Sequence, residues 1–163
     1  MMSIRIPMLS ALYVVIFSAC GGGAVESMLS PAQRFAVEDL LREHKNAELV
    51  QPTECTNSLL ARYQSEHPNY SPYYAEADFN GDGSLDFVIA TKVAGAYDLW
   101  LFLGSVTEYR RPENFLTLTW LNEGGLIVQG RNLFVGKFYS DDGTTFAWDS
   151  MAGRFALYSP EMP

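Results

Sequence analysis

The feature that most constrains the fold is a succession of short β-type segments that fills the chain from Tyr73 onward. Runs rich in β-branched and aromatic residues alternate with turns that contain Gly95, Gly130 or Gly153, a pattern typical of strands joined by tight connections. We expect strands at 85–91, 97–103, 115–121, 125–129, 133–139, 144–148 and 154–158. Because tight turns join antiparallel neighbours, these segments predict one meandering antiparallel sheet.

Helical patterns precede the strands. Ser30 and Pro31 suit an N-cap and a first helical residue, and apolar residues follow at helical spacing to about residue 46. A second helix is capped by Thr56 or Asn57 and ends before Pro68, because the residue before a proline avoids helical backbone angles. Helices first and strands afterwards predict an α+β fold, in which two N-terminal helices pack on one face of the sheet.

The N-terminus has the composition of an export signal. One basic residue, Arg5, precedes an apolar run at 8–17, and small residues then lead to Cys20. The run is shorter than the roughly 20 residues that a membrane-spanning helix needs. We therefore interpret 1–19 as a signal peptide, 20–29 as a Gly-rich tether and 30–163 as a single domain.

The segment Phe17-Ser18-Ala19-Cys20 resembles the lipobox of bacterial lipoproteins, although that family usually has an aliphatic residue where Phe17 stands. The resemblance implies that Cys20 carries a lipid that anchors the mature chain in the membrane, and Gly21 favours the outer membrane of the cell envelope. Cys55 is then an unpaired thiol, either a small buried apolar residue or half of an intermolecular disulfide. In the other interpretation the signal peptide is an ordinary one, and Cys20 is free to pair with Cys55.

The charge of the chain is strongly acidic. The whole sequence has a formal net charge of −8. Removal of 1–19 takes away one basic residue, Arg5, and no acidic one, so the mature chain carries −9. Such a domain repels nucleic acid, and its expected partners are divalent cations or a basic protein.

An acidic loop is the one constellation that points to chemistry. Oxygen-bearing side chains occupy positions 1, 3, 5 and 9 of the string from Asp78 to Asp86, and Gly83 permits a sharp bend at position 6. Calcium takes 6–8 oxygen ligands, which a coiled loop directs at one centre. The loop holds no His or Cys, which argues against zinc or copper. The expected calcium ligands are the side chains of Asp78, Asn80, Asp82 and Asp86 and the carbonyl of Ser84.

The loop is not an EF-hand, because Ile89 stands at position 12, where that motif has a bidentate Glu. Residues 77–90 instead resemble the calcium loops of FG-GAP/VCBS-type repeats, in which an acidic loop lies between two strands. The resemblance implies the same ligands, with Asn80 in place of the commoner Asp weakening the site. It covers too little of the chain for a propeller, which needs about four blades or more. The alternative is that Asn80-Gly81 and Asp82-Gly83 only form turns.

Other side chains are weaker candidates. His44 and His67 have no metal-ligand neighbours in the sequence, and Asp141-Asp142-Gly143 is typical of a hairpin turn with, at best, loose cation binding. The sequence has no Gly-x-Ser-x-Gly, His-Glu-x-x-His or phosphate-binding glycine loop. Tryptophans in the expected strands serve sheet packing or, alternatively, a sugar-binding platform; they are Trp100, Trp120 and Trp148.

Three functions of different classes are compatible with these features. The leading hypothesis is a calcium-binding lipoprotein domain of the cell envelope that binds a partner without catalysis. The second is a periplasmic inhibitor or immunity protein against a secreted toxin or hydrolase, since a basic partner suits the acidic charge. The third is an enzyme whose catalytic acids are Glu123, Asp141 or Asp142.

Overall fold

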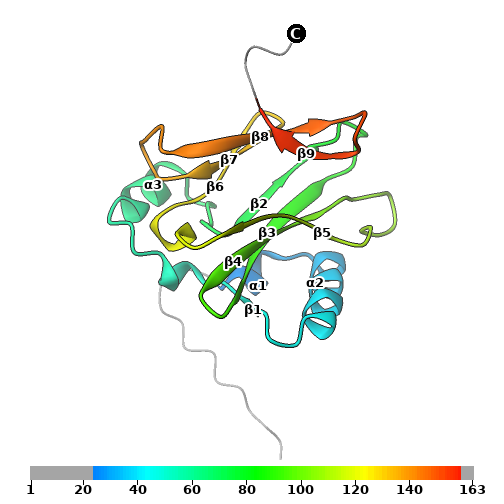
Figure 1. The fold of residues 1–163 in the computed structure, drawn as a ribbon, viewed down its shortest axis with the longest axis horizontal. Coiled ribbons are helices and arrows are strands. Elements are labelled where there is room, and N and C mark those ends of the chain that lie inside the picture. Colours follow the sequence, from blue (N-terminus) through cyan, green and yellow to red (C-terminus); the bar gives the residue numbers. More distant parts are fainter. Residues whose placement is uncertain (1–23, 159–163) are drawn as a thin grey trace, which may run out of the picture.

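Three layers make up residues 24–158, the part of the chain that the computed structural model describes (Figure 1). In chain order the elements are α1 (Val25–Met28), α2 (Pro31–Glu43), β1 (Glu48–Leu49), η1 (Pro52–Glu54), α3 (Leu60–Glu66), β2 (Tyr74–Ala77), β3 (Asp86–Val93), β4 (Ala96–Phe102), β5 (Glu113–Leu118), η2 (Leu121–Glu123), β6 (Gly125–Gln129), β7 (Asn132–Gly136), β8 (Gly143–Asp149) and β9 (Arg154–Leu157). Helix α2, a first sheet of β1 to β5 and a second sheet of β6 to β9 form the layers. The α+β class and the antiparallel pairing of the strands are confirmed.

The first sheet has β3 at its centre. It pairs with β4 from Phe87 opposite Phe102 to Val93 opposite Ala96, while β1 and β2 share its other edge and β5 extends the sheet beyond β4. Successive strand residues point to opposite faces. Val88 therefore packs in the core between the two sheets, whereas Ile89 packs in a second core beneath α2. Both faces of this sheet are covered.

Helix α2 begins where the sequence predicts it. The Ser30 hydroxyl accepts a hydrogen bond from the backbone N–H of Gln33, and the Gln33 side chain accepts one from the backbone N–H of Ser30, which completes a capping box. Val37 and Leu40 then bury against Phe87 and other residues of the first sheet. The Gln33 amide also donates to Tyr74 Oη at 3.1 Å and to Glu76 Oε1 at 2.7 Å.

The second helix does not share that position. Helix α3 has no buried residue and lies beside the second sheet, near β6 and β7 in Figure 1. Its Tyr63 ring contacts the rings of Tyr70 and Phe138, with centroids 4.6 and 5.2 Å away. The prediction of two helices on one face of one sheet is therefore wrong for α3. This helix contacts its neighbours through the half-buried ring of Tyr63 and has no buried apolar stripe that could cover a sheet.

The single meander is also corrected, because β6 does not pair with β5. The short connection at 122–124, between two segments expected to pair, is instead part of the crossover to the second sheet and overlaps the 3₁₀ turn η2. Strand β6 starts beside the segment that leads into β2, where the N–H of Leu126 donates to the carbonyl of Pro72 at 2.9 Å. Strands β6 to β9 then form a meander of their own.

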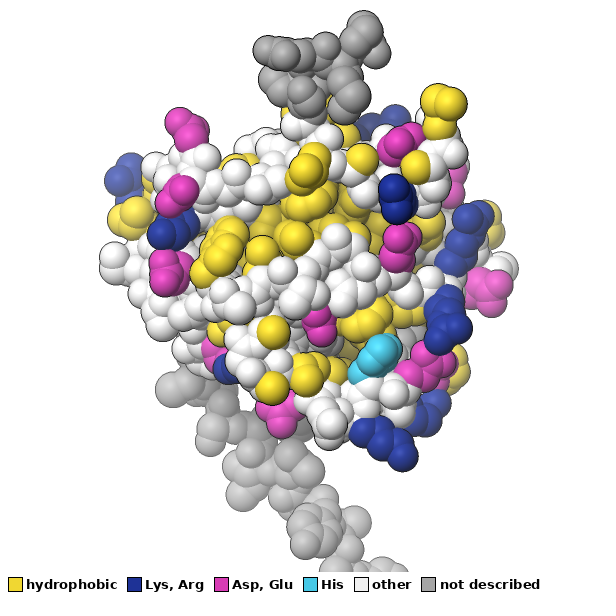
Figure 2. Space-filling model, in the orientation of Figure 1, with side chains coloured by type: hydrophobic (Ala, Val, Ile, Leu, Met, Phe, Trp, Pro, Cys, Tyr) yellow, Lys and Arg dark blue, Asp and Glu magenta, His cyan; other side chains and the backbone are white. Residues whose placement is uncertain are grey.

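The core between the sheets is not closed on every side. Figure 2 shows hydrophobic side chains that reach the surface in the hollow between the upper and lower layers. Partly buried members of this core are Phe115, Leu116, Leu118, Trp120 and Trp148. Trp100, in contrast, is buried under α2, and its indole N–H donates to Thr91 Oγ1 at 2.9 Å.

The folded domain begins earlier than the sequence suggests. Residues 25–29 were expected to belong to the tether, yet Val25–Met28 forms α1 and both Val25 and Leu29 are buried. Two apolar side chains that insert into the core explain why these residues join the domain. The predicted signal peptide at 1–19 and the lipidation site Cys20 lie outside the described residues. In residues 24–158, no helix is long and apolar enough to cross a membrane.

Candidate functional site

The acidic loop connects two paired strands. Ala77 at the end of β2 lies opposite Asp86 at the start of β3, so residues 78–85 form the connection. Phe79 anchors the loop in the core between the sheets, where its ring centroid lies 5.2 Å from that of Phe155 of β9. Glycines at 81 and 83 have φ values of 75° and 89°, a left-handed conformation that favours glycine. The loop therefore follows the tight course that its glycines predict.

Asp78 organises the loop through backbone amides. Its Oδ1 accepts hydrogen bonds from the N–H groups of Gly81 and Asp82 at 2.7 and 3.1 Å, and its Oδ2 accepts one from Gly83 at 3.1 Å. Asp82 in turn accepts hydrogen bonds from the Ser84 N–H at 2.8 Å and from the Asn80 amide at 2.9 Å. These two donors, the Ser84 N–H above all, lower the pKa of Asp82. Hydrogen bonds thus link Asp78 to Asp82, and Asp82 to Asn80 and Ser84, while their role as calcium ligands stays a prediction.

Asp86 differs from these half-buried or exposed residues in its burial. Its carboxylate is fully buried, with Oδ2 accepting from the N–H groups of Phe79 and Asn80 at 3.0 and 3.2 Å and Oδ1 accepting from Gly104 at 2.8 Å. Burial raises the pKa of this carboxyl, although the three backbone donors act in the opposite direction. Asp86 therefore ties the loop to the chain beyond β4, a role that the motif alone does not reveal.

The loop residues differ in how well they could serve as calcium ligands. Asp78, Asn80 and Asp82 have oxygens of the kind that calcium prefers and are half-buried or exposed. Asp86 is fully buried among three backbone donors, so a cation could reach it only if the loop rearranged. Within residues 24–158, no group of three or more His, Cys, Asp or Glu side chains is arranged to hold a metal.

One basic side chain approaches the loop from the second sheet. Arg131, in the turn between β6 and β7, donates from Nε to the carbonyl oxygen of Asp78 at 3.2 Å. Its guanidinium lies so close to Gly81 that a Cβ at this position would collide with it. The loop is thus in contact with both sheets.

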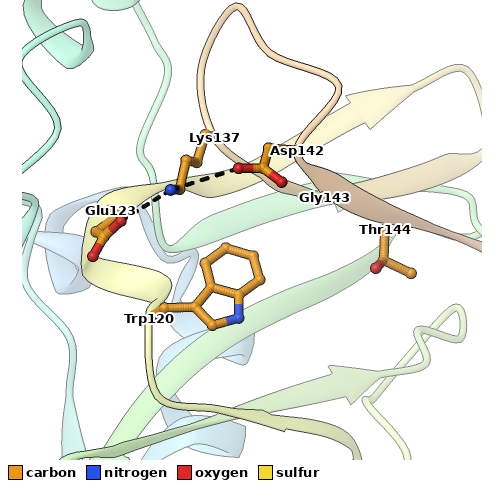
Figure 3. Close-up of a pocket in the computed structure, with 6 residues that line it drawn as sticks. All are labelled: Trp120, Glu123, Lys137, Asp142, Gly143 and Thr144. Atoms are coloured by element: carbon orange, nitrogen blue, oxygen red, sulfur yellow. Dashed lines mark ion pairs between the residues drawn. The ribbon is translucent and has the colours of Figure 1, made fainter.

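A second candidate site is a hollow of about 380 Å³ beside η2 (Figure 3). Lys137 Nζ lies between two carboxylates, 3.1 Å from Glu123 Oε2 and 3.6 Å from Asp142 Oδ2. The nearby Glu123 carboxylate raises the pKa of Lys137. In Figure 3 the indole of Trp120 lies below these charged groups and faces the same space. Glu123 and Asp142, named as acids in the enzyme hypothesis, are therefore brought together as partners of one lysine.

The remaining sequence candidates are held by local contacts. The His44 ring packs on Trp100 with ring centroids 4.7 Å apart, and the His67 ring packs on Tyr63 with ring centroids 4.4 Å apart. Cys55 is partly buried against the core and forms no disulfide within the described residues. Lys137 is the functional candidate that sequence reasoning missed, because its two partners come from separate turns. No family model, curated protein or solved structure matches the chain.

Proposed function

We propose that the chain is a non-enzymatic binding domain of the cell envelope, anchored by a lipid on Cys20 and stabilised by calcium at the Asp78–Asp86 loop. The main support for calcium binding is the position of the loop between the two sheets. Asp86 ties it to the first sheet through Gly104, and Arg131 touches it from the second sheet. A cation that orders this loop would therefore stabilise the contact between both sheets.

The proposed ligands are oxygens of the half-buried and exposed residues of the loop. Asp78, Asn80 and Asp82 would contribute side chains and Ser84 its carbonyl, while Asp86, which is fully buried, would contribute only if the loop rearranged. Few carboxylates and an exported location favour weak binding, with a Kd of about 10⁻⁴–10⁻³ M. Calcium at 100 times its Kd would then add about 2.7 kcal/mol to the free energy of unfolding.

Melting temperatures test the proposal directly. The mature chain is unfolded thermally in millimolar calcium and in a chelator, and we expect calcium to raise the midpoint. Asp82→Ala should remove most of this increase, since it deletes a ligand with no buried partner. Asp141→Ala, which deletes an exposed acid from another turn, is the matched control and should keep the increase. A wild-type midpoint that calcium leaves unchanged would show that the loop is only a turn.

The anchor has a separate test. Wild-type protein should partition with membranes and incorporate radioactive palmitate, because two or more acyl chains anchor a protein stably. Cys20→Ala should abolish both, while Cys55→Ala should change neither. Equal labelling of the Cys20→Ala variant and the wild type would refute the lipoprotein assignment.

A further inference from the structure

The hollow beside η2 lies where the crossover packs closely on the second sheet. A Cβ at Gly124 would lie 2.2 Å from the carbonyl oxygen of Gly136, so this approach of the two backbones requires glycine. The N–H of Lys137 donates to the carbonyl oxygen of Asp142 at 2.9 Å, which closes the turn between β7 and β8. The backbone therefore fixes the positions from which Glu123, Lys137 and Asp142 extend into the hollow.

The charged groups that line the hollow carry an excess of negative charge. Among the described lining residues, the carboxylates of Glu123 and Asp142 outnumber the single ammonium group of Lys137 by one. The Asp142 side chain is 74% exposed, and its Oδ2 lies 3.6 Å from Lys137 Nζ. Since a charge-assisted hydrogen bond measures about 2.7–2.9 Å, this carboxylate is held loosely and can accept a second cation. An anionic ligand would instead meet two carboxylates for each ammonium group.

An aromatic ring faces the same space as these charged groups. Figure 3 shows the indole of Trp120 below Lys137, between the carboxylates of Glu123 and Asp142. The ring is half-buried, because part of it packs against the core while the rest lines the hollow. The electrons of an aromatic face attract cations, and tryptophan does so most strongly. One ligand could therefore contact the indole and a carboxylate at the same time.

This combination of groups favours one class of cation. A metal ion would compete with Lys137 for both carboxylates and would gain nothing from the indole. A guanidinium group is planar, so it can stack on an aromatic ring while its N–H groups form paired hydrogen bonds with a carboxylate. It is also more weakly hydrated than an ammonium group, so it loses less on entering a partly enclosed space. The volume of about 380 Å³ lies in the range of pockets that take small ligands.

We infer that the hollow binds a guanidinium group, which stacks on Trp120 and pairs with Asp142 and Glu123. Such a group belongs either to an arginine side chain of a basic protein or to a small guanidino compound. The formal net charge of −8 attracts both of these cations to the chain. The inference gives the proposed binding role a ligand class and rests on that role, but it depends neither on calcium nor on the lipid anchor.

Nuclear magnetic resonance titration of the mature protein tests the inference, with the tryptophan indole N–H signals as the probe. We expect N-acetyl-arginine amide to shift the signal of Trp120 at millimolar concentration, because exposed ion pairs and cation–π contacts are individually weak. The signal of Trp100, whose N–H donates to Thr91, should not move. Trp120→Phe identifies the responding signal. N-acetyl-lysine amide has the same charge without the planar group, and it should bind at least about threefold more weakly.

Two further ligands distinguish the sources of the guanidinium group. A short peptide with one arginine among glycines and serines is compared with free arginine. Tighter binding of the peptide indicates a protein as the source, whereas tighter binding of free arginine indicates a small compound. Either order supports a guanidinium site.

Four variants test the role of each charge. Asp142→Asn and Glu123→Gln each remove one carboxylate and should weaken the binding of N-acetyl-arginine amide about fivefold. Lys137→Met removes the competing ammonium group and should strengthen binding about fivefold. A lysine that itself held the ligand would give the opposite change. Asp141→Asn is the matched control, because this neighbouring acid does not line the hollow, and it should change the affinity by less than about twofold.

Several outcomes would overturn the inference. They are no binding of N-acetyl-arginine amide at tens of millimolar, equal affinity for the lysine compound, weaker binding in Lys137→Met, or an equal loss in Asp141→Asn. Binding of N-acetyl-glutamate amide would also overturn it, because the ammonium group would then select the ligand. Asp142→Asn and Glu123→Gln change exposed side chains, so they decide the matter if Trp120→Phe fails to fold.

The titration is repeated in chelator, beside the melting temperatures with and without calcium. A calcium-induced rise in melting temperature without guanidinium binding rejects the inference about the hollow alone. Guanidinium binding without that rise rejects the calcium loop alone.

Discussion

In the Asp78–Asp86 loop, the carboxylates of Asp78 and Asp86 accept hydrogen bonds from backbone amides, whereas in the hollow beside η2 the carboxylates of Glu123 and Asp142 flank the ammonium group of Lys137. Asp78 and Asp86 each accept three backbone hydrogen bonds. Glu123 and Asp142 share one partner, and all three of these side chains are partly or largely exposed. The difference indicates that the loop contributes more to stability, because ion pairs between exposed groups contribute little.

The largest effect on stability is expected for Asp86→Ala. The substitution leaves the buried N–H groups of Phe79, Asn80 and Gly104 without an acceptor. Since each such group costs about 1–3 kcal/mol, the free energy of unfolding should fall by about 3 kcal/mol or more. Urea denaturation in chelator measures it, with Asp82→Ala as the exposed control that loses far less. A loss below about 1 kcal/mol would show that Asp86 is not structural.

Tyr139→Ala should behave in the opposite way. The ring is 47% exposed, so its removal should change the free energy of unfolding by less than about 1 kcal/mol. Tyr139→Gly should be at least as stable as Tyr139→Ala, because glycine adopts the positive φ without strain. Urea denaturation of both variants is the measurement. A large loss of stability in Tyr139→Ala would show that the ring is needed to hold the fold together.

A smaller effect is expected where the second sheet meets the loop. Arg131 places a positive charge beside the proposed calcium ligands, and like charges near the surface repel weakly. Arg131→Gln should therefore tighten calcium binding about threefold, an effect that added salt reduces. Calorimetric titration at low and high salt checks both points. Arg154→Gln, on β9, is the control. Weaker calcium binding in Arg131→Gln would mean that the arginine instead positions the ligands.

The smallest effect concerns protonation within the loop. Asp82 has a lowered pKa, so the stability that it contributes is present above the ordinary Asp value of 3.8 and is lost as pH falls through its folded-state value. Asp86 has a raised pKa, so its contribution has the reverse sign and is lost as pH rises. Carboxyl-carbon NMR titration should show Asp86 protonating at the higher pH of the two. The reverse order would contradict the assignment of Asp86 as buried.

Much of the fold could be predicted from local patterns. The Ser30-Pro31 start of α2 and the strand runs around Val88 and Leu99 are specified by neighbouring residues, and the structure has them within a few positions. Strand β2 was missed because Tyr74–Ala77 is short and becomes a strand only by pairing with β3. The division into two sheets was missed because a short connection such as 122–124 is typical of paired neighbouring strands. Only the hydrogen bond from Leu126 to Pro72 in the folded chain shows that β6 pairs elsewhere.

The two candidate sites also differ in whether their residues are neighbours in the sequence. The acidic loop is nine consecutive residues, so Asp78 and Asp82 are visible in the sequence, although the burial of Asp86 is not. Trp120, Lys137 and Thr144, which line the hollow beside η2, come from separate segments of the chain and meet only through the fold. No periodicity or spacing marks such residues, because their proximity is a property of tertiary structure alone.

The two-faced packing of β3 has a consequence for how the domain unfolds. Neighbouring residues of this strand, such as Val88 and Ile89, belong to different cores, so displacement of β3 would open both cores at once. The layers should therefore behave as one cooperative unit and lose their structure together. The backbone amides of β3 should be the last in the molecule to exchange with solvent, since only global opening exposes them.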